Sequence, residues 1–253
     1  MHTAHETWLI FRRAMQQALR NPAWVVITLV QPVLYLALFV PLLQSLVGAP
    51  GFPPGDEWQV MVPALLVQLA LFGTAFVGYG LIAEYRSGVI ERMRVTPVSR
   101  TALLLGRSLR DVVVLTVQGA LLITLAVPFG LRTPISGALL SLALVAVLGL
   151  AMSAASYGLA LKLKSEDAFA PVQNSIIVPV LLLSGVLLPM SLAPAWLFTV
   201  SRFNPFVYVV DATRAAFVGD LASTTVALGV LAAVALSVAA VTFGIRTFQR
   251  ENA

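Results

Sequence analysis

Six long stretches of this chain consist almost entirely of apolar residues, and their length constrains the fold more than any other feature. A helix needs about 20 mostly apolar residues to cross the hydrocarbon of a bilayer. The stretches that meet this requirement are Trp24–Leu46, Met61–Ala83, Ala102–Val127, Ser136–Leu161, Val172–Met190 and Thr224–Ile245. The sequence therefore predicts an all-α polytopic membrane protein, with six transmembrane helices in a single transmembrane domain over residues 1–253.

The composition excludes most soluble classes of protein. Hydrophobic residues make up 59% of the chain and charged residues only 11%, whereas a soluble domain carries about 25% charged residues. Cysteine is absent, and the only histidines are His2 and His5, so the chain offers no thiolate and no imidazole for a metal site or for catalysis within the spans. The net charge of +5 is explained by orientation in a membrane rather than by nucleic acid, which we do not expect as a partner.

The basic residues predict the orientation of the six spans. Most of them fall in the segments 1–22, 84–110, 162–164 and 246–250, which a six-span layout places on one side. By the positive-inside rule this side is cytoplasmic, and both termini lie there. The apolar segment 193–210 is not read as a seventh span, because it contains Arg202 and Pro205. We expect two short helices at the outer interface within residues 191–223, either re-entrant or lying on the surface.

The first 22 residues have the pattern of an amphipathic helix. Apolar side chains recur at spacings of three and four, and basic ones fall largely on other faces. The residues concerned are Trp8, Phe11, Met15 and Leu19 on the apolar stripe, and Arg12 and Arg13 on the polar face. Such a helix lies in the membrane interface, held by lipid. The pattern leaves open whether it is only a lipid anchor or also contacts a cytoplasmic partner.

The loop at 84–101 combines a short apolar face with several charges. Pro97 ends any helix there, and Ser99 is a plausible N-cap for the third span. From the residues alone, this segment is either a helix that docks into a groove on a soluble subunit or a solvated loop. The residues predicted to make such a contact are Gly88, Val89, Ile90, Glu91, Arg92, Met93, Arg94, Thr96 and Pro97.

This loop resembles that of a known family. The runs Ser87–Met93 and Thr96–Arg100 are similar to the loop after the second span in ABC type-2 exporter permeases, especially the daunorubicin-type drug-resistance permeases. Arg20–Pro22 resembles the family's entry elbow, and Asn204–Pro205 with Asp211–Arg214 resembles its final outer motif. The similarity covers roughly residues 8–250.

The resemblance implies a permease of an ATP-driven exporter in a bacterial plasma membrane. Two such permeases, identical or paralogous, would pair, and each would sit on a separate ATP-binding subunit that carries ATP and magnesium. The loop around Gly88–Val95 would be the coupling helix, and residues 1–22 the elbow helix. The transported compound would be hydrophobic or amphipathic: a drug, a lipid or a glycolipid.

The other motifs in the sequence indicate no function beyond the one that this resemblance implies. No phosphate-binding loop of the form G-x-x-x-x-G-K-[ST] is present, so we expect no cofactor on this chain and no enzyme activity of its own. The sequence Val77–Gly80 matches a potassium-filter motif by coincidence, and the nearby glycines are expected to permit close helix approach or a bend. Arg107 with Asp111, and Asp211 with Arg214, are expected to form local ion pairs. An ATP-independent transporter and a membrane scaffold are the alternative functions; the residues of a transport path cannot be identified from the sequence.

Overall fold

The computed structural model describes residues 2–20, 23–88 and 99–250. Within those ranges every regular element is a helix. The long ones are α1 (His2–Leu19), α2 (Ala23–Gln44), α3 (Glu57–Ala75), α6 (Arg100–Ala126), α7 (Ile135–Leu163), α8 (Glu166–Leu182) and α11 (Thr224–Arg250); the short ones are α4 (Gly78–Arg86), η1 (Val127–Phe129), η2 (Met190–Leu192), α9 (Ala195–Ser201) and α10 (Pro205–Phe217). The prediction of an all-helical protein is confirmed for this part of the chain.

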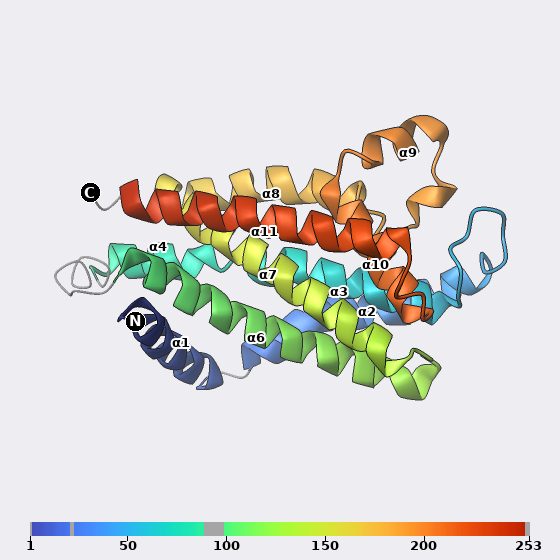
Figure 1. The fold of residues 1–253 in the computed structure, drawn as a ribbon, viewed down its shortest axis with the longest axis horizontal. Coiled ribbons are helices and arrows are strands. Elements are labelled where there is room, and N and C mark those ends of the chain that lie inside the picture. The colour runs from blue at the N-terminus through green and yellow to red at the C-terminus, as the bar shows by residue number, and fades with distance from the viewer. Residues whose placement is uncertain (1, 21–22, 89–98, 251–253) are drawn as a thin grey trace.

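The long helices run side by side along the length of the molecule (Figure 1). Both ends of the chain lie at one end of this bundle, which we call the terminal end. The connection between α2 and α3 and the short helix α9 lie at the opposite end, which we call the distal end. The centre of the core is formed by α3, whose residues from Val60 to Leu71 are all buried.

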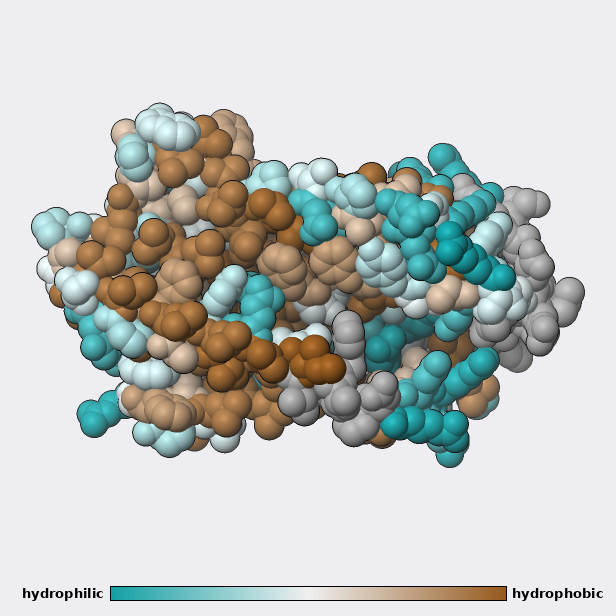
Figure 2. Space-filling view, turned by 180° about the vertical axis from the view of Figure 1, so that it is seen from behind, coloured by the Kyte–Doolittle hydropathy of each residue, from teal (hydrophilic) through white to brown (hydrophobic). Residues whose placement is uncertain are grey.

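Five helical segments are long and apolar enough to cross a membrane, judged by length and composition. They are Ile27–Gln44, Glu57–Arg86, Arg100–Phe129, Ile135–Leu163 and Thr224–Arg250. The surface agrees, because Figure 2 shows apolar side chains over a broad area, while hydrophilic ones gather toward the terminal end. These features identify a membrane protein with several apolar helices.

The fifth predicted span, Val172–Met190, differs from the structure in its bounds. The helix in this region is α8, which has 17 residues and ends at Leu182 rather than at Met190. The chain turns directly afterwards, where Gly185 has a φ of +77°, a conformation that glycine adopts without strain. The carbonyl of Val180 in the last turn accepts a hydrogen bond from Asn204 Nδ2 at 2.8 Å. Residues 183–189 are mostly apolar but not helical, which hydrophobicity alone did not reveal.

Several helix starts follow from local capping. Ser99 is the N-cap of α6, since its hydroxyl accepts from the Ala102 amide at 3.2 Å, as predicted. At α3, Asp56 and Gln59 form a reciprocal capping box, which starts the helix four residues before the predicted span. The region predicted to hold two short helices contains α9 and α10.

Candidate functional site: a broken helix, a cleft and the coupling loop

The second predicted span is interrupted in its middle. The α-helix ends at Ala75 and resumes as α4 at Gly78. Across the break the amide of Tyr79 bonds to the carbonyl of Phe76 at 3.1 Å and that of Gly80 to Val77 at 3.2 Å. This tightening to three-residue hydrogen bonds leaves the carbonyl of Ala75 and the amide of Gly78 to find other partners.

Side chains from two other helices satisfy this break. Ser156 of α7 donates to the Ala75 carbonyl at 2.6 Å and accepts from the Gly78 amide at 3.0 Å. Gln173 of α8 donates a second bond to the Ala75 carbonyl at 2.8 Å. All these bonds are buried, so the break is a specified feature of the fold. Irregular backbone inside a membrane domain is tolerated only where protein groups satisfy it or a cavity is present.

Gly78 allows the neighbouring helices to approach the break. A Cβ atom at this position would lie 2.7 Å from the ring of Phe169 and 2.8 Å from the Ser156 carbonyl. The expectation that the nearby glycines permit close approach and a bend is confirmed at this residue. In the sequence, only the glycine indicates the break. The side chains that satisfy it, Ser156 and Gln173, lie far away in the chain.

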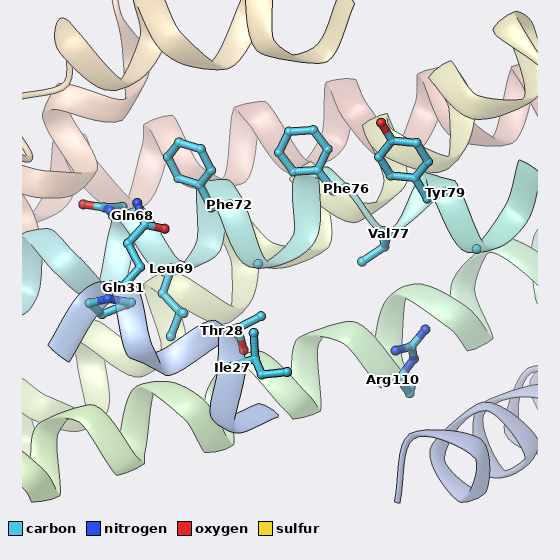
Figure 3. A pocket seen from close by; sticks show the side chains of 13 residues that line it. Ile27, Thr28, Gln31, Gln68, Leu69, Phe72, Phe76, Val77, Tyr79 and Arg110 are labelled. Atoms are coloured by element: carbon cyan, nitrogen blue, oxygen red, sulfur yellow. The ribbon is translucent and has the colours of Figure 1, made fainter. Parts of the chain in front are cut away.

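A cleft of about 640 Å³ lies beside the break, between α2, α3, α4 and α6. Its residues, most of them drawn in Figure 3, are Ile27, Thr28, Gln31, Pro32, Gln68, Leu69, Phe72, Gly73, Phe76, Val77, Tyr79, Gly80 and Arg110. Ile27, Gln31 and Gly80 are exposed at its rim, whereas Gln68 and Leu69 are buried. No single segment of the sequence indicates this cleft, because its lining comes from four helices.

Charged side chains connect the helices toward the terminal end. Arg107 of α6 forms an ion pair with Glu84 of α4, so the predicted pairing of Arg107 with Asp111 is wrong. Asp111 instead accepts from the buried Tyr157 hydroxyl at 2.7 Å and lies 3.2 Å from Nε of Arg110, out of line for a hydrogen bond. The spacing of Arg107 and Asp111 on one helix suggested that they pair. In the structure, Glu84 on α4 takes up the guanidinium of Arg107 instead.

The predicted coupling loop begins where α4 ends. Gly88 follows α4 with a φ of +70°, and its amide bonds to the Tyr85 carbonyl at 3.2 Å. The other predicted contact residues, Val89, Ile90, Glu91, Arg92, Met93, Arg94, Thr96 and Pro97, lie outside the described residues. Beyond them, the Ser99 amide donates to the carboxylate of Glu6 on α1 at 2.9 Å. The described residues on the two sides of this loop, Gly88 and Ser99, are therefore held to α4 and to α1.

Helix α1 packs along α6. A Cβ at Gly106 would lie 2.8 Å from both the Thr7 carbonyl and the Ile10 side chain, so the two helices are in close contact there. Of the residues predicted on the elbow, Trp8, Arg12 and Arg13 are exposed, while Phe11 and Met15 are half-buried. Trp8 stacks on Phe11 with ring centroids 5.3 Å apart.

The motif at Asp211–Arg214 has a structural role at the distal end. Arg214 is buried and donates to the carbonyls of Val60 at 3.1 Å and Gly185 at 2.8 Å, which fastens α10 to α3 and to the turn after α8. Burial lowers the pKa of Arg214 to about 10, opposed by the charge of Asp211, so the guanidinium stays charged at neutral pH. Asp211 pairs instead with Arg202 at 3.4 Å, so the predicted local ion pair between Asp211 and Arg214 is wrong: the guanidinium of Arg214 is taken up by the two carbonyls.

The fold and site together define a helical membrane protein in which apolar helices surround a broken span and a cleft. Among the described residues, no group of acidic or histidine side chains is arranged to hold a metal ion. Comparison with known proteins gives the class: residues 5–218 match the family model described as ABC-2 type transporter.

The chain belongs to the ABC-2 type transporter family. It is 26% identical over 211 residues to a putative transport permease, ycf38, of Cyanophora paradoxa, covering 83% of this chain and 73% of the relative. It is 22% identical over 243 residues to the daunorubicin resistance ABC transporter permease protein DrrB1 of Streptomyces coeruleorubidus, covering 95% and 85%. It is also 24% identical to the probable multidrug ABC transporter permease YbhR of Escherichia coli K12, covering 65% of this chain and 45% of the relative. The resemblance found in the sequence is confirmed.

Proposed function

We propose that this chain is the permease subunit of an ATP-driven exporter that moves a hydrophobic or amphipathic compound outward by alternating access. The observation that carries the proposal is the family match over residues 5–218. The names of two relatives, a daunorubicin resistance permease and a probable multidrug permease, favour an exported drug-like compound over a lipid or glycolipid. A separate ATP-binding subunit and a second permease, identical or paralogous, complete the proposed complex.

In this proposal the terminal end of the bundle faces the cytoplasm of a bacterial cell. The predicted basic segments support this orientation, because the positive-inside rule places them there. In this orientation, α8 crosses the membrane in addition to the five long apolar segments, which brings the number of crossings to six. It is short because the chain turns after Leu182. Helix α1 lies in the inner interface as the elbow, and α9 and α10 lie toward the outer face.

The broken helix supplies a mechanical link between the ATP-binding subunit and the cleft. The coupling loop follows α4 without another element between them, and α4 reaches back to the break at residues 76–77. Movement of the loop would turn α4 about this break, next to residues that line the cleft. ATP binding to the partner would then shift the equilibrium between two arrangements of α4, and coupling requires no more than such a shift.

The proposal is tested by purifying the chain from its native membranes in mild detergent with its partners. We expect a soluble ATPase at stoichiometric amounts. Glu91→Ala and Arg92→Ala should lower transport at least several-fold while the chain still folds and inserts. Arg132→Gln is the matched control, because this exposed residue lies in the connection between η1 and α7, on the outer side in this orientation, and should leave transport unchanged.

Two results would count against the proposal. Full transport in the Glu91 and Arg92 variants would remove the coupling assignment. Purification without any ATPase, repeated in several gentle detergents, would favour the ATP-independent transporter or the scaffold instead.

A further inference from the structure

The cleft beside the broken helix is polar at its two ends and mostly apolar between them. Figure 3 places Gln68 and Gln31 at one end and Arg110 at the other. In Figure 3, Phe72, Phe76 and Val77 lie between these two ends, with Thr28 as a polar side chain among them. At 1.5 Å per residue, a continuous helix from Gln68 to Gly80 would span about 18 Å.

Each end presents a buried polar atom that makes no hydrogen bond to the described residues. The side-chain oxygen of Gln68 has no hydrogen-bond partner there, and the residue is only 1% exposed. The Nε atom of Arg110 is likewise buried without a hydrogen bond, although it forms an ion pair with Oδ1 of Asp111 at 3.2 Å. An unsatisfied buried polar atom is costly, and a bound molecule that satisfies both atoms would remove this cost.

The two atoms require opposite partners. The oxygen of Gln68 accepts and therefore needs a hydroxyl or amino group from a ligand. The Nε–H of Arg110 donates and needs an acceptor, which a carboxylate or phosphate provides best because the hydrogen bond is then charge-assisted. An ordinary lipid carries polar groups at one end only, so it cannot satisfy both.

A second cleft of about 410 Å³ adjoins the first at the Arg110 end. The two share Val77, Gly80 and Arg110 as lining residues. The second cleft continues toward the terminal end between α1, α4 and α6, where Ala14 and Gln17 of α1 line it. A compound held beside α1 therefore has a route past Arg110 into the first cleft.

We propose that the cleft binds a two-headed amphiphile, with an apolar body against Phe72 and Phe76, a hydrogen-bond donor on Gln68 and an acceptor or anionic group on Arg110. The compound enters beside α1 from the cytoplasmic leaflet. This inference rests on the proposed export function for its direction of entry, but the binding site itself does not need the ATP-binding subunit.

The experiment measures equilibrium binding to the purified full chain in lipid nanodiscs, corrected for empty nanodiscs. The probes are radiolabelled 12-hydroxydodecanoate, dodecanoate without the hydroxyl group, and 1-dodecanol without the carboxylate. The hydroxy acid should bind about five- to tenfold more tightly than either comparison probe, the effect of one buried hydrogen bond.

Variants assign the binding to the cleft. In Gln68→Leu, the preference for the hydroxy acid over dodecanoate should disappear. Gly73→Leu should weaken binding of all three probes at least tenfold, since a Cβ at this position meets only ordinary contacts, the nearest 3.7 Å away, and the rest of the side chain fills the cleft. Val117→Phe on the exposed surface of α6 is the matched control for added bulk.

Gly80→Leu provides a second blocking variant if Gly73→Leu does not fold, because a Cβ there has no atom within 4 Å. Equal binding of the three probes to the unmodified chain would overturn the two-headed ligand. Unchanged binding in both glycine variants would overturn the site. Specific binding in a chain that neither purifies with an ATPase nor transports would leave the site intact and contradict the proposed function instead.

Discussion

Helices α3 and α4 come from one predicted span, yet their surroundings differ. Nearly all of α3 is buried, whereas Gly78, Leu81 and Ile82 are the only buried residues of the nine in α4. Helix α3 lies at the centre of the core, while α4 is bordered by two clefts and ends at the predicted coupling loop. One half of the span is thus held in place and the other half has room to move.

The same contrast extends to the neighbours of each half. At the distal end, Arg214 ties α10 to α3 through backbone carbonyls. At the terminal end, α4 is held through side chains, by Glu84 with Arg107 and by the partly exposed pair of Arg86 and Glu166 at 3.6 Å. Partly exposed ion pairs contribute little free energy and exchange partners easily. Substitutions at the two ends should therefore have different consequences.

The largest effect is expected at Arg214. Arg214→Met keeps the volume but leaves the carbonyls of Val60 and Gly185 without their donor, so the free energy of unfolding should fall by roughly 2–4 kcal/mol. Thermal unfolding in detergent measures this change. Arg202→Gln is the control, because its pair with Asp211 is exposed and its loss costs at most about 1 kcal/mol. Equal melting of the two variants would contradict the view that the distal end is the fixed one.

Gly78 tests the break between the two halves. Gly78→Ala should lower the free energy of unfolding by about 1–3 kcal/mol, because the new methyl group meets the Ser156 carbonyl and the Phe169 ring. In the same assay Gly80→Ala should be neutral or stabilising by up to about 1 kcal/mol, since a Cβ there meets nothing within 4 Å and alanine favours the helix. The comparison fails if the two alanine variants are equally stable.

Local patterns predicted much of this fold, and contacts between distant residues explain the rest. Hydrophobic length found the helices, and the hydroxyl of Ser99 correctly indicated where α6 begins. The break after Ala75 could not be predicted, because the groups that satisfy it come from Ser156 and Gln173 on other helices.

The cleft and the ion pairs were missed for the same reason. The cleft is lined by residues of four helices, and no segment of the sequence carries its pattern. The pairing of Arg107 was wrong because the nearest acid in the chain, Asp111, is not its nearest acid in space, which is Glu84. Periodicity describes one helix at a time, whereas this site exists only where several helices meet.

The smallest effect that still sharpens the comparison is expected at Ser156. Ser156→Ala removes one of the two donors to the Ala75 carbonyl, which keeps Gln173. It also removes the only hydrogen-bond partner of the Gly78 amide among the described residues. We expect a loss of about 1–2 kcal/mol in the free energy of unfolding and faster hydrogen exchange at the Gly78 amide. Ser141→Ala, on the same helix, is the matched control. Within the described part of the chain, its buried hydroxyl makes one long bond, 3.5 Å to the Thr213 carbonyl, and its loss should cost less. Faster exchange confined to residues near the break would mean that Ser156 holds α4 against α3; exchange that rises equally along α3 would mean that the two halves move together.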